Sequence, residues 1–328
     1  MALTDSFVAE HIQRWEEQLR SPLYPYRVKW PSRLFHHAPL ENAVKIIDDG
    51  RLRSRADPKN RRQMDVAASG VIDARVHAHQ YTRLYFRPRT PTQYHIEGIR
   101  KAGECKYGDS AHAPVLIMFV FDAQSILTRP DVRFCDRNMQ QSSAVSGDTE
   151  DYFLRIPFDK VYHEGGISDD ASIISHRCAE VLTPSPLPLN ETLQWIYCRS
   201  DAERDTLIYL LGDNGKKLAK SMLVSEDLKV FQREYAFVED VALTNDGIVF
   251  RLNPRYDRAK VDVTVRAWSA KGAEMRNFRN REMAATPDYP AKRWRVPTTF
   301  QPGRYRVRIE LDGHLAFSDE LRLGPSFF

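Results

Sequence analysis

The chain has 328 residues and a net charge of +4, a length that allows about two domains. Hydrophobic residues make up 42% of it and charged residues 28%, which excludes a disordered, collagen-like or coiled-coil protein. Its first residues mix charged and apolar types, unlike a secretory signal, and no run approaches the ~20 apolar residues of a membrane span. Four scattered cysteines without a CxxC pair predict reduced thiols. We therefore expect a cytoplasmic protein without a metal site.

Patterns of apolar residues predict mixed helices and strands up to about residue 225. Helical spacing predicts helices over 5–19 and 201–211, and Pro39 and Gly50 mark the start and the end of another. Short apolar or alternating runs predict strands over 33–38, 82–86, 115–122, 132–138, 179–184 and 193–199. Residues 51–80 are polar and basic, which predicts a long functional loop with a short helix. We also expect a helix after residue 87 and a polar loop over 140–149.

After about residue 235 the pattern changes to short segments in which apolar and polar residues alternate. Asn245-Asp246-Gly247 and Asp312-Gly313 are turn sequences that favour tight hairpins. About 90 residues of this kind predict a small β-sandwich of the immunoglobulin-like type. The expected fold class is therefore an α+β domain over 1–225 followed by an all-β accessory domain over 236–328.

Charge is distributed unevenly along the chain. Residues 51–100 hold 11 Lys or Arg against 4 Asp or Glu, and residues 250–328 hold 16 against 9, a local net charge of +7 in each. Residues 141–190 hold 3 against 8, a local net charge of −5. The basic segments favour a polyanionic partner, and ordinary ion pairs on solvated faces are the alternative that charge alone leaves open.

Three stretches carry residue types suited to catalysis or phosphate binding. The first is Phe35-His36-His37-Ala38 together with Asn42. The second is the basic loop that contains Arg61-Arg62, together with the segment 84–94 after it. The third is the segment 177–182. A guanidinium can bind phosphate oxygens with two parallel hydrogen bonds, and a carboxylate at a strand end can act as a general base or stabilise a cation. The chain has no P-loop, GxGxxG, GxSxG or HExxH motif, so it does not belong to the common classes that use them.

Taken in order, these stretches resemble the DarT family, bacterial toxins that transfer ADP-ribose from NAD onto nucleic-acid bases. The matching residues are His36, Asn42 with Gly50, Arg61 or Arg62, Tyr85-Phe86-Arg87-Pro88-Arg89-Thr90-Pro91, and Ala179-Glu180-Val181-Leu182. The resemblance covers roughly residues 30–215 and implies an ADP-ribosyltransferase-like split β-sheet. Ala38 stands where the family often has Thr or Ser, and the β-rich C-terminal segment is not part of the family's minimal toxin.

The resemblance implies roles in binding NAD. His36 would hold the nicotinamide side of NAD, or its ribose, through hydrogen bonds, and Asn42 would support the wall of the pocket. Arg61 or Arg62 would bind the pyrophosphate or the incoming nucleotide, and the spacing favours Arg61 as the catalytic arginine and leaves Arg62 for the cofactor.

The resemblance also implies that Glu180 is the catalytic carboxylate. It would take a proton from the base, or hold the 2′-hydroxyl of the NAD ribose, as an oxocarbenium-like state forms. Either role requires an ionised carboxylate, which neighbouring Arg177 would favour. Substrate binding would fall to Arg83, Tyr85, Arg87 and Arg89, with the arginines along the nucleic-acid backbone. Tyr81, Tyr85, Phe86 and Tyr94 are the aromatic residues available for stacking on bases.

The expected activity is therefore NAD-dependent transfer of ADP-ribose onto a base of single-stranded nucleic acid, with DNA favoured over RNA. The resemblance implies a toxin–antitoxin or phage-defence system, whose antitoxin would be a macrodomain or a protein that blocks the pocket. The β-sandwich could bind substrate, the antitoxin or a chaperone. A non-catalytic nucleic-acid-binding adaptor is the alternative from another class. A metal-dependent nuclease would need clustered ligands, which Asp169-Asp170 and His36-His37 do not form by spacing.

Overall fold

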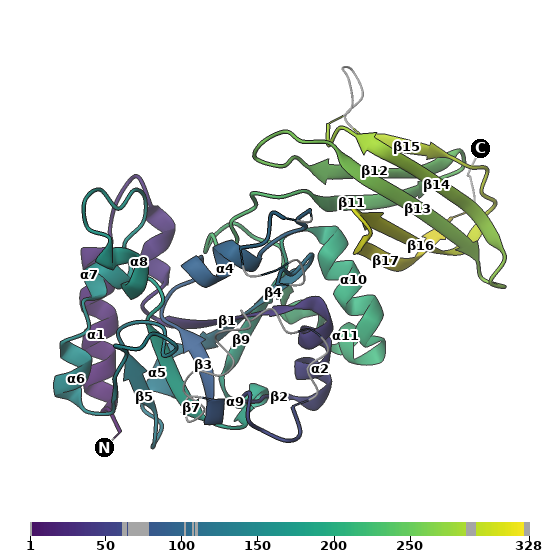
Figure 1. The fold of residues 1–328 in the computed structure, drawn as a ribbon. Coiled ribbons are helices and arrows are strands. Elements are labelled where there is room, and N and C mark those ends of the chain that lie inside the picture. The colour runs from purple at the N-terminus through teal and green to yellow at the C-terminus, as the bar shows by residue number, and fades with distance from the viewer. Residues whose placement is uncertain are drawn as a thin grey trace. The chain divides into compact units, whose positions relative to one another are not determined.

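The structure is a computed structural model that describes residues 2–60, 64, 79–101, 103–106, 108, 111–286 and 293–324 (Figure 1). Its contacts divide the chain into two compact units. The first unit comprises Met1–His95, Ile117–Tyr197 and Ser225–Gln232, and the second comprises Ile96–Leu116, Cys198–Val224 and Arg233–Phe328. Much of the loop expected over 51–80, with Arg61 and Arg62, lies outside the described residues.

The first unit contains a β-sheet whose strands follow the order β9-β4-β1-β3-β7-β5-β6 (Figure 1). These strands are β1 (Arg33–Pro39), β3 (Tyr81–Tyr85), β4 (Leu116–Asp122), β5 (Arg133–Cys135), β6 (Ser146–Gly147), β7 (Glu180–Pro184) and β9 (Leu193–Tyr197). β1 pairs antiparallel with β3, β3 with β7, and β7 with β5. Every residue of β4 before Asp122 is buried, which explains its uninterrupted apolar sequence.

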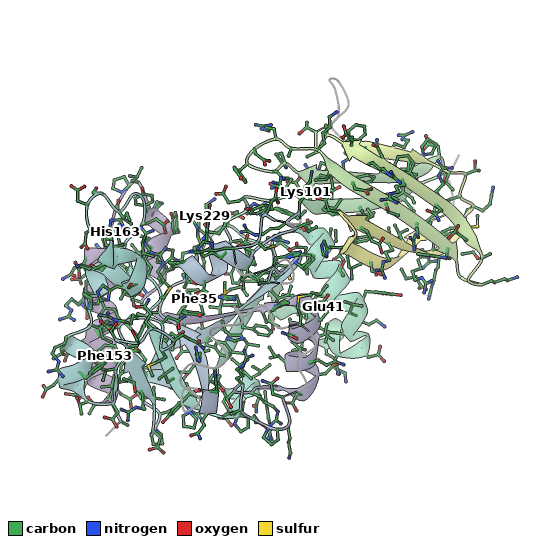
Figure 2. All side chains as sticks on the ribbon, in the orientation of Figure 1. Phe35, Glu41, Lys101, Phe153, His163 and Lys229 are labelled. Carbon is green, nitrogen blue, oxygen red and sulfur yellow. The ribbon has the colours of Figure 1, made fainter. Side chains whose placement is uncertain are left out.

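Helices and a small strand pair surround this sheet. They are α1 (Asp5–Gln18), η1 (Pro25–Lys29), α2 (Leu40–Asp49), α4 (Pro91–Ile96), α5 (Ala123–Leu127), α6 (Glu150–Leu154), α7 (Phe158–Val161), α8 (Ser172–His176) and α9 (Leu189–Thr192), with β2 (Arg51–Leu52) paired to β8 (Leu187–Pro188). The ring of His11 on α1 lies 4.7 Å from that of Phe153 on α6 and 4.4 Å from that of Phe158 on α7. Phe153 is labelled in Figure 2. Burial lowers the pKa of His11 to about 3, so this histidine is an uncharged member of an aromatic core.

α2 begins after Pro39 and ends at Gly50, as the sequence predicts. Gly50 has a φ of +65°, in the left-handed region that residues with a Cβ rarely adopt. Its N–H donates to the carbonyl of Ile47 at 3.1 Å. Nothing lies within 4 Å of the place where a Cβ would stand, so a side chain at Gly50 would be penalised by the backbone conformation alone.

Replacing Gly50 by alanine is expected to lower the free energy of unfolding by about 1 kcal/mol, because alanine pays the left-handed penalty that glycine avoids. Gly50→Asn is the matched control, since asparagine tolerates this region better than alanine does. Urea unfolding of both variants measures the difference. Equal stability of Gly50→Ala and the unaltered protein would contradict this account of the cap.

The second unit contains two antiparallel sheets that share one core. The three-stranded sheet has the order β11-β12-β15 and the four-stranded sheet the order β14-β13-β16-β17. Its elements are α10 (Asp201–Leu211), α11 (Asp213–Leu218), η3 (Ala219–Ser221), β10 (Met222–Leu223), β11 (Phe237–Thr244), β12 (Gly247–Asn253), β13 (Val261–Ser269), β14 (Glu274–Met283), β15 (Trp294–Pro297), β16 (Gly303–Leu311) and β17 (His314–Leu323). Alternate residues of both sheets form this core, among them Ile248 and Phe250 from one and Val265 and Val307 from the other.

The structure confirms most of the expected elements and corrects several. The strand expected over 132–138 is only Arg133–Cys135, and the loop expected over 140–149 contains β6. The helix after residue 87 ends at Ile96, two residues before Gly98 with its φ of +97°. β14 was not expected as a strand, because its sequence is mostly polar and charged. No helix in the described part of the chain is both long and apolar enough to span a bilayer.

Candidate active site

Glu180 stands at the start of β7, in the middle of the sheet of the first unit. The strand register places it opposite Tyr85 on β3 and opposite Cys135 on β5. Tyr85 in turn lies opposite Phe35 on the central strand β1, which Figure 2 labels. Because residues opposite each other on antiparallel strands project to the same face, these side chains form one row across the sheet. The sequence motifs around Phe35, Tyr85 and Glu180 thus meet in space.

The carboxylate of Glu180 is fully buried, and only one of its two oxygens accepts a hydrogen bond from the described residues. Oε2 accepts a hydrogen bond from the backbone N–H of Met139 at 3.0 Å. Oε1 lies 3.8 Å from Nη1 of Arg83 and has no hydrogen-bond partner among the described residues. Burial raises the pKa of Glu180, while Arg83, the Met139 N–H and the hydroxyl of Tyr85 oppose this shift. A buried carboxyl with a raised pKa and one oxygen that has no hydrogen-bond partner is suited to accept a proton, or a hydrogen bond from a hydroxyl group.

Arg83, and not Arg177, is the cation beside this carboxylate. The sequence suggested Arg177 because it is only three residues away along the chain. Its Nη2 instead donates to the carbonyl of Gly165 at 2.6 Å and lies 2.7 Å from Nδ1 of His163. Arg83 is two residues from Tyr85 on β3, the strand that pairs with β7, which brings its guanidinium to Glu180.

Two neighbouring histidines on β1 face β3 in different ways. Nδ1 of His36 lies 3.0 Å from the carbonyl of Arg83, and burial lowers the pKa of His36 to about 4. The imidazole is therefore neutral at pH 7, and the contact assigns the proton to Nδ1 and leaves Nε2 as an acceptor. The ring of His37 lies parallel to the ring of Tyr85, with centroids 5.5 Å apart. Neither ring nitrogen of His37 has a hydrogen-bond partner among the described residues.

Asn42, in the first turn of α2, binds the backbone of one residue in the basic loop. Its Nδ2 donates to the carbonyl of Met64 at 2.7 Å, and its Oδ1 accepts the Met64 N–H at 3.1 Å. This paired contact agrees with a supporting role for Asn42. Arg61 and Arg62, the two arginines assigned from the sequence, lie outside the described residues.

Arg87 and Arg89 are both tied to Glu164, a residue that the sequence analysis did not single out. Arg87 is 1% exposed, its Nη2 donates to Glu164 Oε2 at 2.8 Å, and its Nη1 donates to the carbonyl of His163. Burial lowers the pKa of Arg87 to about 10. Arg89 is more exposed and lies 3.6 Å from Glu164. The structure thus places Arg87 inside the protein, where it orders the segment around residues 163–165.

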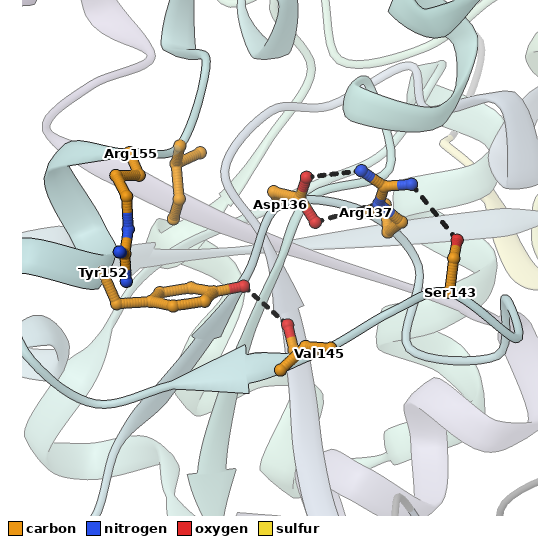
Figure 3. Close-up of a pocket in the computed structure, with 7 residues that line it drawn as sticks. Asp136, Arg137, Ser143, Val145, Tyr152 and Arg155 are labelled. Atoms are coloured by element: carbon orange, nitrogen blue, oxygen red, sulfur yellow. Dashed lines mark hydrogen bonds and ion pairs between the residues drawn. The ribbon is translucent and has the colours of Figure 1, made fainter.

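The loop that donates to Glu180 also lines a cavity of about 230 Å³ (Figure 3). Asp136, which follows the Cys135 of the central row, forms two hydrogen bonds with Arg137, at 2.9 and 2.7 Å. Arg137 also donates to Ser143 at 3.2 Å, and Tyr152 donates to the Val145 carbonyl at 2.5 Å. Figure 3 shows these side chains around the opening. The loop between β5 and β6 therefore lines this cavity and also contacts the carboxylate of Glu180, through the Met139 N–H.

The sequence did not indicate the Met139 contact or Glu164. The Met139 contact comes from a backbone N–H, which no side-chain pattern reports. The sequence did single out His37 within the stretch Phe35-His36-His37-Ala38, but assigned it no role. Glu164 precedes two glycines, a weak sign of an ordered turn. The described residues contain no group of three or more His, Cys, Asp or Glu side chains that could hold a metal ion.

The sequence model of the DarT family, whose description is ssDNA thymidine ADP-ribosyltransferase, matches residues 35–227. Among solved structures, Thermus sp. 2.9 DarT in complex with ADP-ribosylated ssDNA is 18% identical, covers 60% of this chain and 96% of its own, and has a TM-score of 0.48. Thermosipho africanus DarTG in complex with ADP-ribose is 17% identical, covers 70% of this chain and 57% of its own, and has a TM-score of 0.44. The comparison with curated proteins finds no match. Because the family model spans more than half of the sequence, the chain belongs to the DarT family of ssDNA thymidine ADP-ribosyltransferases.

Proposed function

We propose that the chain transfers ADP-ribose from NAD onto a thymidine base of single-stranded DNA, with Glu180 at the reacting centre. One observation carries this proposal: a fully buried carboxylate lies within the region that matches the family. Its Oε2 accepts a hydrogen bond from Met139, and its Oε1 has no hydrogen-bond partner among the described residues. A carboxylate shielded from water interacts more strongly with a developing positive charge than an exposed one does.

The reaction exchanges one glycosidic bond for another. The bond between nicotinamide and ribose breaks, nicotinamide leaves with the electron pair, and positive charge develops on the ribose. The ring nitrogen of thymine that bears a proton forms the new bond to that ribose carbon. Glu180 takes the proton that this nitrogen loses; where Glu180 instead holds the ribose 2′-hydroxyl while the bond forms, that proton passes to water. Tyr85 and Arg83 line the same place and position the carboxylate.

The other roles are those that the family resemblance implies. His36, whose Nε2 is the acceptor when Nδ1 carries the proton, is proposed to hold the nicotinamide amide or the ribose. Asn42 supports the pocket through Met64, and Arg61 or Arg62 binds the pyrophosphate or the incoming nucleotide. Arg89 is proposed to contact the DNA backbone, and the buried Arg87 to hold the segment with Glu164, to which Arg89 also lies close.

The biological setting that we propose is a toxin–antitoxin or phage-defence system in the cytoplasm. Modification of DNA bases would stop replication in the host cell, so an uncontrolled enzyme would be toxic. An antitoxin is therefore required, either a macrodomain that removes ADP-ribose or a protein that blocks the pocket. The family match favours DNA as the substrate over the RNA alternative.

We propose that residues 236–328 form an accessory domain of the immunoglobulin-like type. In support, two antiparallel sheets of three and four strands share a core. Tyr305, near the start of β16, donates its hydroxyl hydrogen to the carbonyl of Gln301 at 2.9 Å and accepts the Gln301 N–H at 3.2 Å. A tyrosine that bonds back to the backbone at this point is typical of such sandwiches. β14, the fourth strand of this domain in chain order, pairs with β13 in the four-stranded sheet. In constant-type domains the fourth strand belongs instead to the sheet of the first two strands.

The proposal predicts transfer of a single ADP-ribose that requires thymidine. Purified protein with NAD is expected to raise the intact mass of a single-stranded DNA oligonucleotide with one thymidine by one ADP-ribose. The same oligonucleotide with cytidine in that place, and an RNA of the same sequence with uridine, are expected to stay unmodified. Modification of the cytidine control would contradict thymidine as the acceptor, and modification of RNA alone would overturn the proposal in favour of the RNA alternative.

A further inference from the structure

The four-stranded sheet of the second unit has one apolar face and one basic face. Along β13 and β16, buried residues such as Val265 and Val307 alternate with partly or fully exposed ones. The exposed face carries five arginines and one tryptophan, which we call the arginine face, and the carboxylates of Asp262, Glu310 and Glu320 lie on the same side of the sheet. The arginines and the tryptophan are Arg266 and Trp268 on β13, Arg304, Arg306 and Arg308 on β16, and Arg322 on β17.

Like charges lie directly opposite each other on this face. The register pairs Arg266 with Arg308 across β13 and β16, and Arg304 with Arg322 across β16 and β17. Side chains at such positions have Cβ atoms about 5 Å apart, and two equal charges there destabilise the sheet. The two pairs are separated by the row that holds Arg306. A folded domain that keeps two such pairs on one face retains charge at a cost in stability, which points to an anionic ligand.

Carboxylates neutralise only part of this charge. Arg308 binds Glu310 at 2.9 Å and Arg304 binds Glu320 at 3.3 Å, both through exposed or half-exposed arginine side chains. Arg266, Arg306 and Arg322 form no ion pair among the described residues, although Glu320 stands opposite Arg306 in the strand register. The arginines of this face therefore outnumber the carboxylates beside them.

An aromatic ring lies in the middle of this surface. Arg306 stands opposite Trp268, and its guanidinium carbon lies 4.4 Å from the centre of the Trp268 ring. The ring is only partly exposed, with the cation stacked over it. Guanidinium groups and aromatic rings side by side form the usual surface that holds single-stranded nucleic acid, through phosphate contacts and base stacking. A protein partner would instead require an apolar centre, and apart from Trp268 the arginine face has none.

We propose that the arginine face binds the backbone of single-stranded DNA, as a second contact for the substrate outside the active site. The choice of DNA over another polyanion rests on the proposed function of the first unit. Two linked sites on one strand raise the local concentration of the acceptor near the enzyme without any new contact at the carboxylate.

The test compares two triple variants of the full chain that remove equal charge. Arg266→Gln/Arg306→Gln/Arg322→Gln alters the arginine face, and Arg251→Gln/Arg293→Gln/Arg295→Gln is the control on or next to the three-stranded sheet. Binding of a fluorescent 30-nucleotide DNA strand is measured by anisotropy at several salt concentrations, without NAD. The first variant is expected to bind at least ~10-fold more weakly at low salt, with a slope of log K against log salt shallower by about 2. The control is expected to match the unaltered protein.

A third variant and an activity measurement separate the possible failures. Replacing the same three residues by lysine is expected to retain the salt slope, because lysine keeps the charge. At saturating oligonucleotide, all variants are expected to transfer ADP-ribose as fast as the unaltered protein does. If no protein transferred ADP-ribose, that result would contradict the proposed function but would not test DNA binding by the arginine face, which the anisotropy measurement decides. Equal affinity and equal salt slope in the two glutamine variants would overturn the proposal.

Discussion

The Glu180→Gln protein is expected to transfer ADP-ribose at least ~100-fold more slowly than the unaltered protein, because an amide can neither accept the proton of the base nor stabilise a positive ribose. The substitution keeps the size of the side chain, and the amide oxygen can still accept the hydrogen bond from the Met139 N–H. Folding and DNA binding should therefore be retained. The rate of label transfer from NAD to a thymidine oligonucleotide measures the effect.

Stability provides the control for this variant. Burial raises the pKa of Glu180 in the folded protein above its unfolded value, so its stabilising contribution is present at low pH and is lost as pH rises through the folded pKa. Glutamine carries no charge and avoids this loss. Glu180→Gln is expected to be more stable than the unaltered protein at pH 7, on the order of 1 kcal/mol, and equally stable at low pH. A fully active Glu180→Gln protein would remove Glu180 from the reacting centre.

The sequence predicted structure best where residues close together in the chain determine it. Helix α2 is bounded by Pro39 and Gly50, two residues whose backbone preferences act locally, and both ends were predicted correctly. Glu180 was singled out from the motif around it; its carboxylate is fully buried, and its catalytic role stays a prediction. The cation beside it was assigned wrongly, because chain distance favoured Arg177 while strand pairing brings Arg83.

Strand β14 shows the opposite situation. Its exposed and half-exposed positions carry Arg276, Arg279 and Arg281, and only Met283 is buried, so no alternation of apolar residues marks it. Its pairing with β13 over most of its length makes it a strand. Edge strands with charged side chains resist pairing with other chains, which gives this composition a physical reason that periodicity cannot report. The Met139 contact was hidden for a similar reason, since it depends on a backbone group.

Arg83→Gln is expected to move the acidic limb of the pH–rate profile to higher pH and to lower the transfer rate at neutral pH by roughly tenfold. Arg83 opposes the effect of burial on the pKa of Glu180, so its removal lets that pKa rise further. Below the new pKa a larger share of the enzyme holds a protonated carboxyl that cannot accept a proton. The rate is measured between pH 5 and 9 over a range of DNA concentrations at saturating NAD, which gives kcat and KM for DNA at each pH.

Arg83→Lys is the matched control, and the shape of the profile decides between two roles for this residue. Lysine keeps the positive charge near Oε1 of Glu180, so its profile should stay close to that of the unaltered protein. If Arg83 acts on the carboxylate, Arg83→Gln recovers activity at high pH and its loss falls on kcat. If Arg83 only binds the DNA backbone, as the sequence motif suggested, KM for DNA rises equally at every pH and the limb does not move. An unmoved limb would therefore separate Arg83 from Glu180 and return it to the substrate.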